Sequence, residues 1–162
     1  MRRDLKRKLD QTEPEKREVY LRELGKIVDA FHERGIVHYN LAPDNVYIDA
    51  AGRIIVIDFG NAKREVSRMM QMKTNILDLR YSAPEVITAG ASGPSADLYS
   101  LGAIMYRMTE GKEPPQSRTR VRKHDGLLVR SGTPYRSLIE ALTVPAPERR
   151  PGCAMDVLAQ LR

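Results

Sequence analysis

Residues 36–60 of the chain read IVHYNLAPDNVYIDAAGRIIVIDFG, and the fold can be worked out from this stretch. Two apolar runs flank Ala50-Ala51-Gly52, a composition that predicts a β-hairpin. A polar loop precedes the first run, and Asp-Phe-Gly follows the second. The hairpin is therefore expected to hold Asn45 and Asp58 on the same side, where their oxygen atoms could share a divalent cation. The alternative is that both residues only form turns.

The stretch resembles the catalytic loop and the metal-binding turn of eukaryotic-like protein kinases, whose pattern is H-R-D-L-x-x-x-N followed by D-F-G. The matching positions are His38, Leu41, Asn45, Asp58, Phe59 and Gly60. Three positions depart from the pattern, namely Tyr39, Asn40 and Ala42. These departures decide what the resemblance implies about activity.

Three further motifs follow in the order of the family. Ala83-Pro84-Glu85 resembles the A-P-E that ends an activation segment, which would here span residues 58–85. Residues 97–102 resemble the start of the central helix of the large lobe, and Pro147 to Pro151 resemble its P-x-x-R-P. The resemblance implies a mainly α fold, the C-terminal lobe of a protein kinase with one small β-hairpin, as a single domain over residues 1–162.

The same resemblance predicts weak binding of nucleotide. A complete kinase begins with a small β-rich N-lobe, which supplies a glycine-rich phosphate cover, a lysine and a glutamate. The sequence starts too late to encode these parts, so the N-lobe is expected to be absent. No cofactor is therefore certain, and any binding of magnesium, through Asn45 and Asp58, or of ATP is expected to be weak.

The catalytic loop argues against phosphate transfer. In the family an aspartate accepts the proton of the substrate hydroxyl, but here that position is Asn40, whose amide cannot take a proton near pH 7. Loss of a general base typically costs about 10²–10⁴ in rate. Ala42 stands at the position of a phosphate-neutralising lysine, and Tyr39 at that of an arginine that binds a phosphorylated activation loop. Asp78 could swing toward Asn40 and replace the missing carboxylate.

The floor of an adenine site is expected at Val46 and Tyr47. The family usually has an aliphatic residue at Tyr47, and a phenol there either fills part of the floor or stacks on the base. The surface normally covered by the N-lobe would include Val46, Tyr47 and Phe59. An exposed apolar patch of this kind favours a protein partner or a homodimer.

Other residues have architectural roles by the same resemblance. Arg150 would pair with Glu85 in a partly buried ion pair. Asp97, at the start of a helix, either complements the helix dipole or accepts backbone N–H bonds near His38 and Tyr39.

Apolar periodicity predicts the helices. Residues 12–15 carry a helix-start signature, apolar residues recur at helical spacing from Tyr20 to Phe31, and Gly35 is expected to end this helix in a left-handed conformation. His32 is expected to act as a cation at its C-terminal end. Further helices are predicted at 5–9, 95–108, 138–142 and 155–161, and irregular structure at 61–81 and 111–126.

Composition and charge limit the classes of protein. The 162 residues, 41% hydrophobic and 30% charged, fit one soluble globular domain. No apolar run approaches the ~20 residues that span a bilayer, the polar start does not resemble a signal peptide, and the single Cys153 excludes an internal disulfide framework. A cytoplasmic location is expected.

The net charge of +6 gathers at residues 2–8 and 118–123, of which the first cluster is expected to be the solvated face of a short helix. Neither cluster has interleaved aromatic residues for base stacking, so nucleic acid is a disfavoured partner.

Three functions follow from these observations. The favoured one is a catalytically impaired protein-kinase-like domain that acts through protein binding or regulation. The first alternative is a serine/threonine kinase remnant that binds ATP and magnesium and phosphorylates only when another chain completes it. The second alternative is a basic binder of nucleic acid or anionic surfaces.

Overall fold

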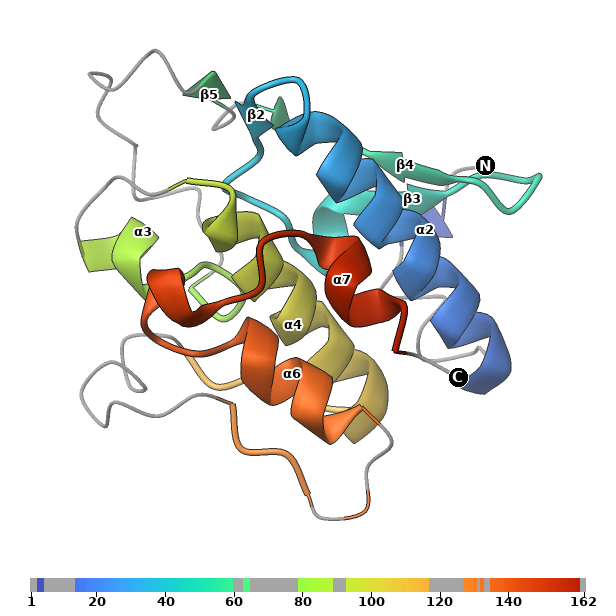
Figure 1. Ribbon diagram of the computed structural model, residues 1–162. Coiled ribbons are helices and arrows are strands. Elements are labelled where there is room, and N and C mark those ends of the chain that lie inside the picture. Colours follow the sequence, from blue (N-terminus) through green and yellow to red (C-terminus); the bar gives the residue numbers. More distant parts are fainter. Residues whose placement is uncertain are drawn as a thin grey trace.

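The structure, a computed structural model, describes residues 3–4, 14–59, 63–64, 79–88, 93–116, 127–130, 132 and 135–160. Most of its regular structure is helical, as predicted (Figure 1). The helices are α2 (Pro14–His32), α3 (Pro84–Thr88), α4 (Ser95–Glu110), α6 (Arg136–Leu142) and α7 (Ala154–Leu158), with two 3-10 turns, η1 (Pro43–Asn45) and η4 (Pro147–Arg149). The strands are β1 (Arg3–Asp4), β2 (Ile36–Val37), β3 (Val46–Ile48), β4 (Ile54–Val56) and β5 (Lys63–Arg64).

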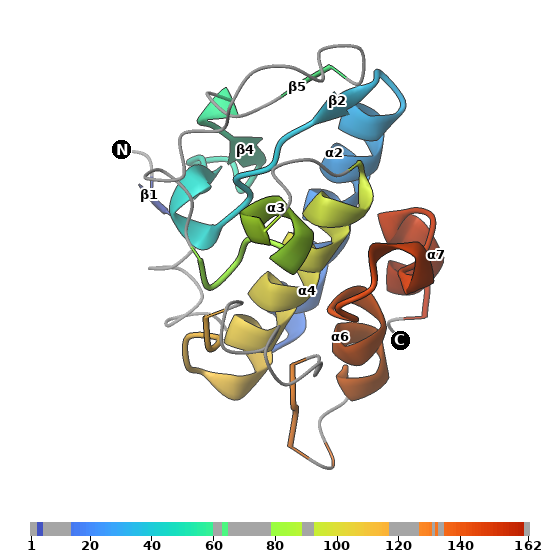
Figure 2. The ribbon, with the colours of Figure 1, turned by 90° about the vertical axis from the view of Figure 1, so that its left-hand side faces the viewer.

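Helix α4 forms the centre of the molecule. All of its residues except Ser95, Arg107 and Thr109 are buried, which explains why its sequence is apolar on nearly every face. Helix α6 packs along α4, and α2 contacts both α4 and α7. Figure 2 shows α6 and α7 on one side of α4, with the hairpin of β3 and β4 on the other.

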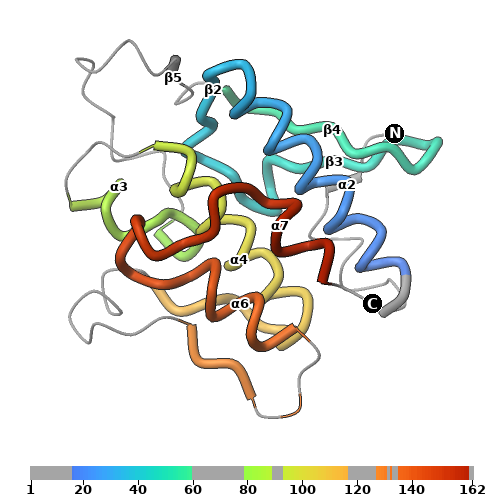
Figure 3. The backbone as a smooth tube through the Cα atoms, in the orientation of Figure 1, coloured from blue at the N-terminus to red at the C-terminus, as the bar shows by residue number. Residues whose placement is uncertain are grey.

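Helix α2 forms as its periodicity predicts. Leu21, Leu24 and Val28 are almost completely buried and join the main core. The helix ends before Gly35, whose φ of 67° is the expected left-handed conformation. In Figure 3 the chain can be followed from this end of α2 through β2 and on to the hairpin, so α2 determines where the polar loop begins.

The predicted hairpin is confirmed. Strands β3 and β4 pair antiparallel with Val46 opposite Val56, and Gly52 in the turn has a φ of 83°. Asp49 stabilises the turn, because its Oδ1 accepts hydrogen bonds from the backbone nitrogens of Ala51 and Arg53, both at 2.9 Å. The hairpin therefore presents the end of the polar loop and the residues after β4 side by side.

Two segments differ from the prediction because strand pairing depends on distant residues. Arg3 was expected on the face of a short helix, but Arg3–Asp4 forms β1 and pairs with β3. Lys63–Arg64, within the segment expected to be irregular, forms β5 and pairs with β2. The predicted helix at 5–9 and the basic cluster at 118–123 lie outside the described residues.

The remaining helices agree with the periodicity apart from their ends. Helix α6 begins before the predicted 138–142, and α7 ends at Leu158 rather than at Leu161. Within the described part of the chain, no helix is both long enough and apolar enough to span a membrane.

Candidate functional site

The candidate site is the loop between β2 and β3 together with the residues that follow β4. His38 is buried at the start of this loop. Its Nε2 lies 3.0 Å from the carbonyl oxygen of Ile57, and its Nδ1 lies 3.2 Å from the backbone nitrogen of Asn40. A carbonyl only accepts and a backbone N–H only donates, so the ring carries its proton on Nε2. His38 thereby ties the loop to the end of the hairpin.

Asp97 anchors the same loop from α4. Its Oδ2 accepts a hydrogen bond from the backbone nitrogen of His38 at 2.8 Å, and its Oδ1 accepts one from that of Tyr39 at 2.9 Å. Of the two predicted roles, the hydrogen-bonded one is therefore present. The Asp97 carboxylate is completely buried, so these bonds replace the water it has lost.

His32 has a contact that sequence reasoning missed. It was expected to act only as a cation at the end of α2, but its Nε2 lies 2.9 Å from Oδ2 of Asp97. The two residues are 65 positions apart, so no local pattern could reveal this pair. The available hint was a histidine in the last turn of a helix, only six positions before His38.

Asn40, at the position of the family's catalytic aspartate, connects the parts of the site. Its side-chain Nδ2 donates to Oδ2 of Asp58 at 3.2 Å. Its backbone oxygen accepts from Nδ2 of Asn45 at 2.8 Å. Asn40 is 4% exposed, Asn45 is half-buried and Asp58 is exposed. The structure thus brings the three predicted site residues together through Asn40.

A divalent cation fits this cluster only in part. Each of Asn45 and Asp58 has one side-chain oxygen that receives none of the hydrogen bonds just described, and both atoms are of the hard type that magnesium prefers. However, the described residues contain no group of three histidine, cysteine or acidic side chains that could hold a metal ion. Asn45 and Asp58 would supply two ligands, and a bound magnesium ion would there neutralise phosphate charge. The other ligands would have to come from water and phosphate.

Tyr39 and Ala42 fill apolar space. Tyr39 is 8% exposed and packs in a small core with Ala83, which precedes α3, with Val86 of α3, and with Ala96 and Tyr99 of α4. Its φ of 62° is unusual for a bulky residue, so the packing and the bond to Asp97 hold a strained backbone. Ala42 is buried in the main core. Neither side chain presents a cation to the site.

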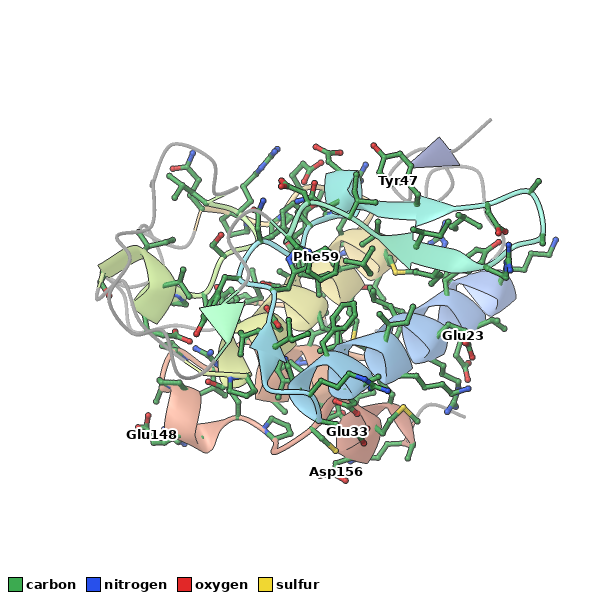
Figure 4. The ribbon with its side chains drawn as sticks, turned by 90° about the horizontal axis from the view of Figure 1, so that it is seen from above. Glu23, Glu33, Tyr47, Phe59, Glu148 and Asp156 are labelled. Atoms are coloured by element: carbon green, nitrogen blue, oxygen red, sulfur yellow. The ribbon has the colours of Figure 1, made fainter. Side chains whose placement is uncertain are left out.

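The predicted apolar surface is only partly present. Phe59 is 42% exposed and contacts the rings of Phe31 and His38, with centroids 5.2 and 4.8 Å apart. Tyr47 is half-buried on the outer face of β3, beside β1 (Figure 4). Val46 points to the opposite face and has no exposed surface, so its expected places in an adenine floor and on a bare patch are wrong.

The predicted ion pair between Glu85 and Arg150 is confirmed. Nη1 and Nη2 of Arg150 lie 2.6 and 2.9 Å from the two carboxylate oxygens of Glu85. The arginine side chain is completely buried. The pair links α3, which begins at the end of the activation-segment-like region, to the residues after η4.

Two predicted participants lie outside the described residues. These are Asp78, which was expected to stand in for the carboxylate missing at Asn40, and Gly60 of the Asp-Phe-Gly turn.

Cys153 lines a cavity of about 420 Å³ that opens between α2 and α7. Burial raises the pKa of its thiol, which keeps the sulfur protonated and makes it a poor nucleophile near neutral pH.

Comparisons with known proteins agree with this geometry. The family model described as "Protein kinase domain" matches residues 1–160. A probable serine/threonine-protein kinase of Dictyostelium discoideum is 32% identical over 140 residues, which cover 82% of this chain and 31% of that protein. Ribosomal protein S6 kinase alpha-6 of Danio rerio is 31% identical over 150 residues, covering 88% of this chain and 20% of that protein.

A third relative is Citron Rho-interacting kinase of Mus musculus, which is 34% identical over 130 residues. These residues cover 76% of this chain but 6% of that protein. The chain therefore spans a third or less of the length of these curated relatives.

Proposed function

Because the chain belongs to the protein kinase family, we propose that it is a catalytically impaired member that acts by binding another protein. The observation that carries the proposal is the bond from the Asn40 amide to Asp58. At the position of a proton acceptor the chain has a group that cannot take up a proton near neutral pH. The chain would form the large helical lobe, in keeping with the order of the motifs.

Two further observations support an impaired site. Ala42 and Tyr39 are buried among apolar residues, so the described loop carries neither of the cations expected from the family pattern. A transferring phosphoryl group is stabilised mainly by positive charge and by positioning. Loss of both the proton acceptor and these cations would lower the rate of phosphate transfer.

The exposed ring of Phe59 supports protein binding. The side chain lies next to the site, and its ring contacts the rings of Phe31 and His38. A rigid, partly exposed aromatic residue is a common anchor at protein interfaces. We therefore place the partner-binding surface around Phe59 and Tyr47, with either another protein or a second copy of this chain as the partner.

A single observation favours the alternative of a kinase completed by another chain. Asn45 and Asp58 are close together, each bonded to Asn40, and each retains an oxygen for a magnesium ion. ATP could then bind through its phosphates and the metal. The buried Ala42 and the amide of Asn40 count against turnover in such a complex.

The deciding experiment is transfer of labelled phosphate from ATP to the chain itself and to serine/threonine substrates. We expect the wild-type chain with magnesium to match the Asp58→Ala variant. Wild-type transfer that Asp58→Ala abolishes would overturn the proposal. A nucleotide titration by thermal shift, with and without magnesium, separates a chain that binds ATP without turnover from one that is inert.

The binding surface is tested by substitution of Phe59. We expect Phe59→Ser to weaken association, measured by sedimentation of the chain alone and with candidate partners. Leu128→Ser, at a side chain that is 80% exposed, is the matched control and should leave association unchanged. Equal association of both variants would argue against this surface.

A further inference from the structure

Asn40 is held at three points, two on its backbone and one on its side-chain amide, and the third gives the direction of the amide. Its backbone nitrogen donates to His38, its backbone oxygen accepts from Asn45, and its Nδ2 donates to Oδ2 of Asp58. An ionised carboxylate can only accept, so the amide must turn its NH₂ group, and not its oxygen, toward Asp58. The N–H groups carry the positive end of the amide dipole.

The Asn40 amide turns the positive end of its dipole toward Asp58, one of the two residues that would bind a divalent cation. A cation shared by Asn45 and Asp58 would lie against the Asp58 carboxylate and offset its charge. In this structure the Asn40 amide lies against one oxygen of that carboxylate and offers it a hydrogen-bond donor. The donor belongs to a side chain that is 4% exposed and held on both sides of its backbone, so it is preorganised.

We propose that Asn40 is a positioning residue whose amide replaces a divalent cation beside Asp58, so that the site keeps its arrangement without metal. The inference rests on the proposed function, because only a site that transfers no phosphate can do without the ion. Asn40 therefore stabilises the cation-free form of the site, besides lacking the basic carboxylate of the family.

An aspartate at position 40 would reverse this relationship. Its carboxylate would lie against Oδ2 of Asp58 where the amide now lies at 3.2 Å, so two negative oxygens would meet. Position 40 is buried but Asp58 is exposed, so water would reach the pair from one side only and would screen the repulsion in part. A divalent cation would relieve the repulsion, with the free side-chain oxygen of Asn45 as a third ligand. The substitution should therefore create a dependence on metal that the wild-type chain lacks.

The experiment measures the thermal midpoint Tm of the full chain in millimolar MgCl₂ against NaCl of equal ionic strength, without nucleotide. We expect no magnesium-specific change for the wild type. Asn40→Asp should lower Tm by roughly 3–6 °C in NaCl, and MgCl₂ should restore most of the loss. Asn40→Ala removes the donor without adding charge, so it should lower Tm by less and show no response to magnesium.

Two controls keep the result interpretable. The double variant Asn40→Asp with Asp58→Asn, the swapped pair, restores one donor and one acceptor. It should therefore fold even if Asn40→Asp alone does not, and its Tm should not change with magnesium. Gln160→Glu makes the same amide-to-acid change at an exposed residue of α7's C-terminal turn and should leave the magnesium response at zero.

Three results would overturn the inference. The first is a wild-type Tm that rises with magnesium as much as that of Asn40→Asp. The second is an Asn40→Asp variant with unchanged Tm and no response, and the third is a swapped pair that fails to fold. Phosphate transfer by the wild-type chain would overturn the proposed function. The Tm measurement uses no nucleotide, so the two outcomes can be told apart.

Discussion

Arg150 illustrates how a single buried cation can hold distant segments together. Besides Glu85, its guanidinium donates to the carbonyl oxygens of Val144, Ser95 and Pro145 at 2.8, 2.9 and 3.0 Å. It also lies over the ring of Tyr99, with 4.9 Å from Cζ to the ring centroid. Its polar atoms are thus satisfied, and only Glu85 neutralises its charge among these partners.

The first prediction concerns this pair. Glu85→Ala should lower the free energy of unfolding by about 3–5 kcal/mol, because it leaves the buried guanidinium of Arg150 without its carboxylate partner. Urea denaturation followed by circular dichroism measures the change. Glu148→Ala, at an exposed acid in the neighbouring 3-10 turn η4, is the control and should stay within about 0.5 kcal/mol of wild type. Equal stabilities of the two variants would contradict the importance of the pair.

The contacts of Asp97 show which features of a single residue could be predicted from the sequence. The resemblance predicted that Asp97 bonds the backbone near His38 and Tyr39, and this is confirmed. It did not predict His32, whose ring reaches the same carboxylate from α2. The reason is that a hydrogen bond between two side chains depends on how their helices are packed, which residue type alone does not encode.

At the scale of elements, two glycines allow close packing of helices. A Cβ atom on Gly102 of α4 would lie 2.7 Å from Cβ of Leu142 and 2.7 Å from Cγ2 of Thr143. A Cβ atom on Gly25 of α2 would clash with Cδ1 of Leu158. The first clash involves an atom next to the backbone of α6, whereas the second involves the tip of a side chain that can rotate.

The second prediction compares these contacts. Gly102→Ala should lower the free energy of unfolding by roughly 1–3 kcal/mol, because α4 and α6 must move apart. Gly25→Ala should cost less, because a rotation of Leu158 and the higher helix propensity of alanine offset the clash. Chemical denaturation of both variants gives the comparison. A larger loss for Gly25→Ala would show that Leu158 cannot move.

The elements themselves were predicted more easily than their pairing. Helical periodicity and the left-handed Gly35 were sufficient for α2, and two apolar runs around Gly52 were sufficient for the β3–β4 hairpin. Strand β1 was missed because Arg3–Asp4 has no strand pattern of its own and forms only by pairing with β3.

At the scale of the whole molecule, a single main core connects the elements. It includes residues of α2, β3, α4, α6 and α7 as well as the segment at 127–130. Glu110, at the end of α4, ties that segment to the core, because its Oε2 accepts a hydrogen bond from Nε of Arg130 at 2.7 Å. Burial by itself would raise the pKa of Glu110, but the bonds and charge of Arg130, with Lys112, outweigh it and hold the pKa below its ordinary value.

The third prediction is a dependence of stability on pH. A carboxylate whose pKa is lowered in the folded state contributes stability above its unfolded pKa of about 4.5, and this contribution is lost as the pH falls through the folded pKa. Urea midpoints measured from neutral pH down to acid should therefore fall less steeply for Glu110→Gln than for the wild type. Parallel curves would mean that Glu110 contributes nothing to the acid sensitivity.

The sequence by itself determined the features that depend on neighbouring residues: the course of α2 and α4, the hairpin and its turn, and the neutral amide at Asn40. Each follows from spacing or from side-chain chemistry within one short stretch. Only the tertiary structure decided how those stretches meet: the burial of Val46, the contact of His32 with Asp97, and the direction of the Asn40 amide toward Asp58. The physical reason is that packing of distant segments selects one of many side-chain arrangements that the local sequence leaves equally favourable.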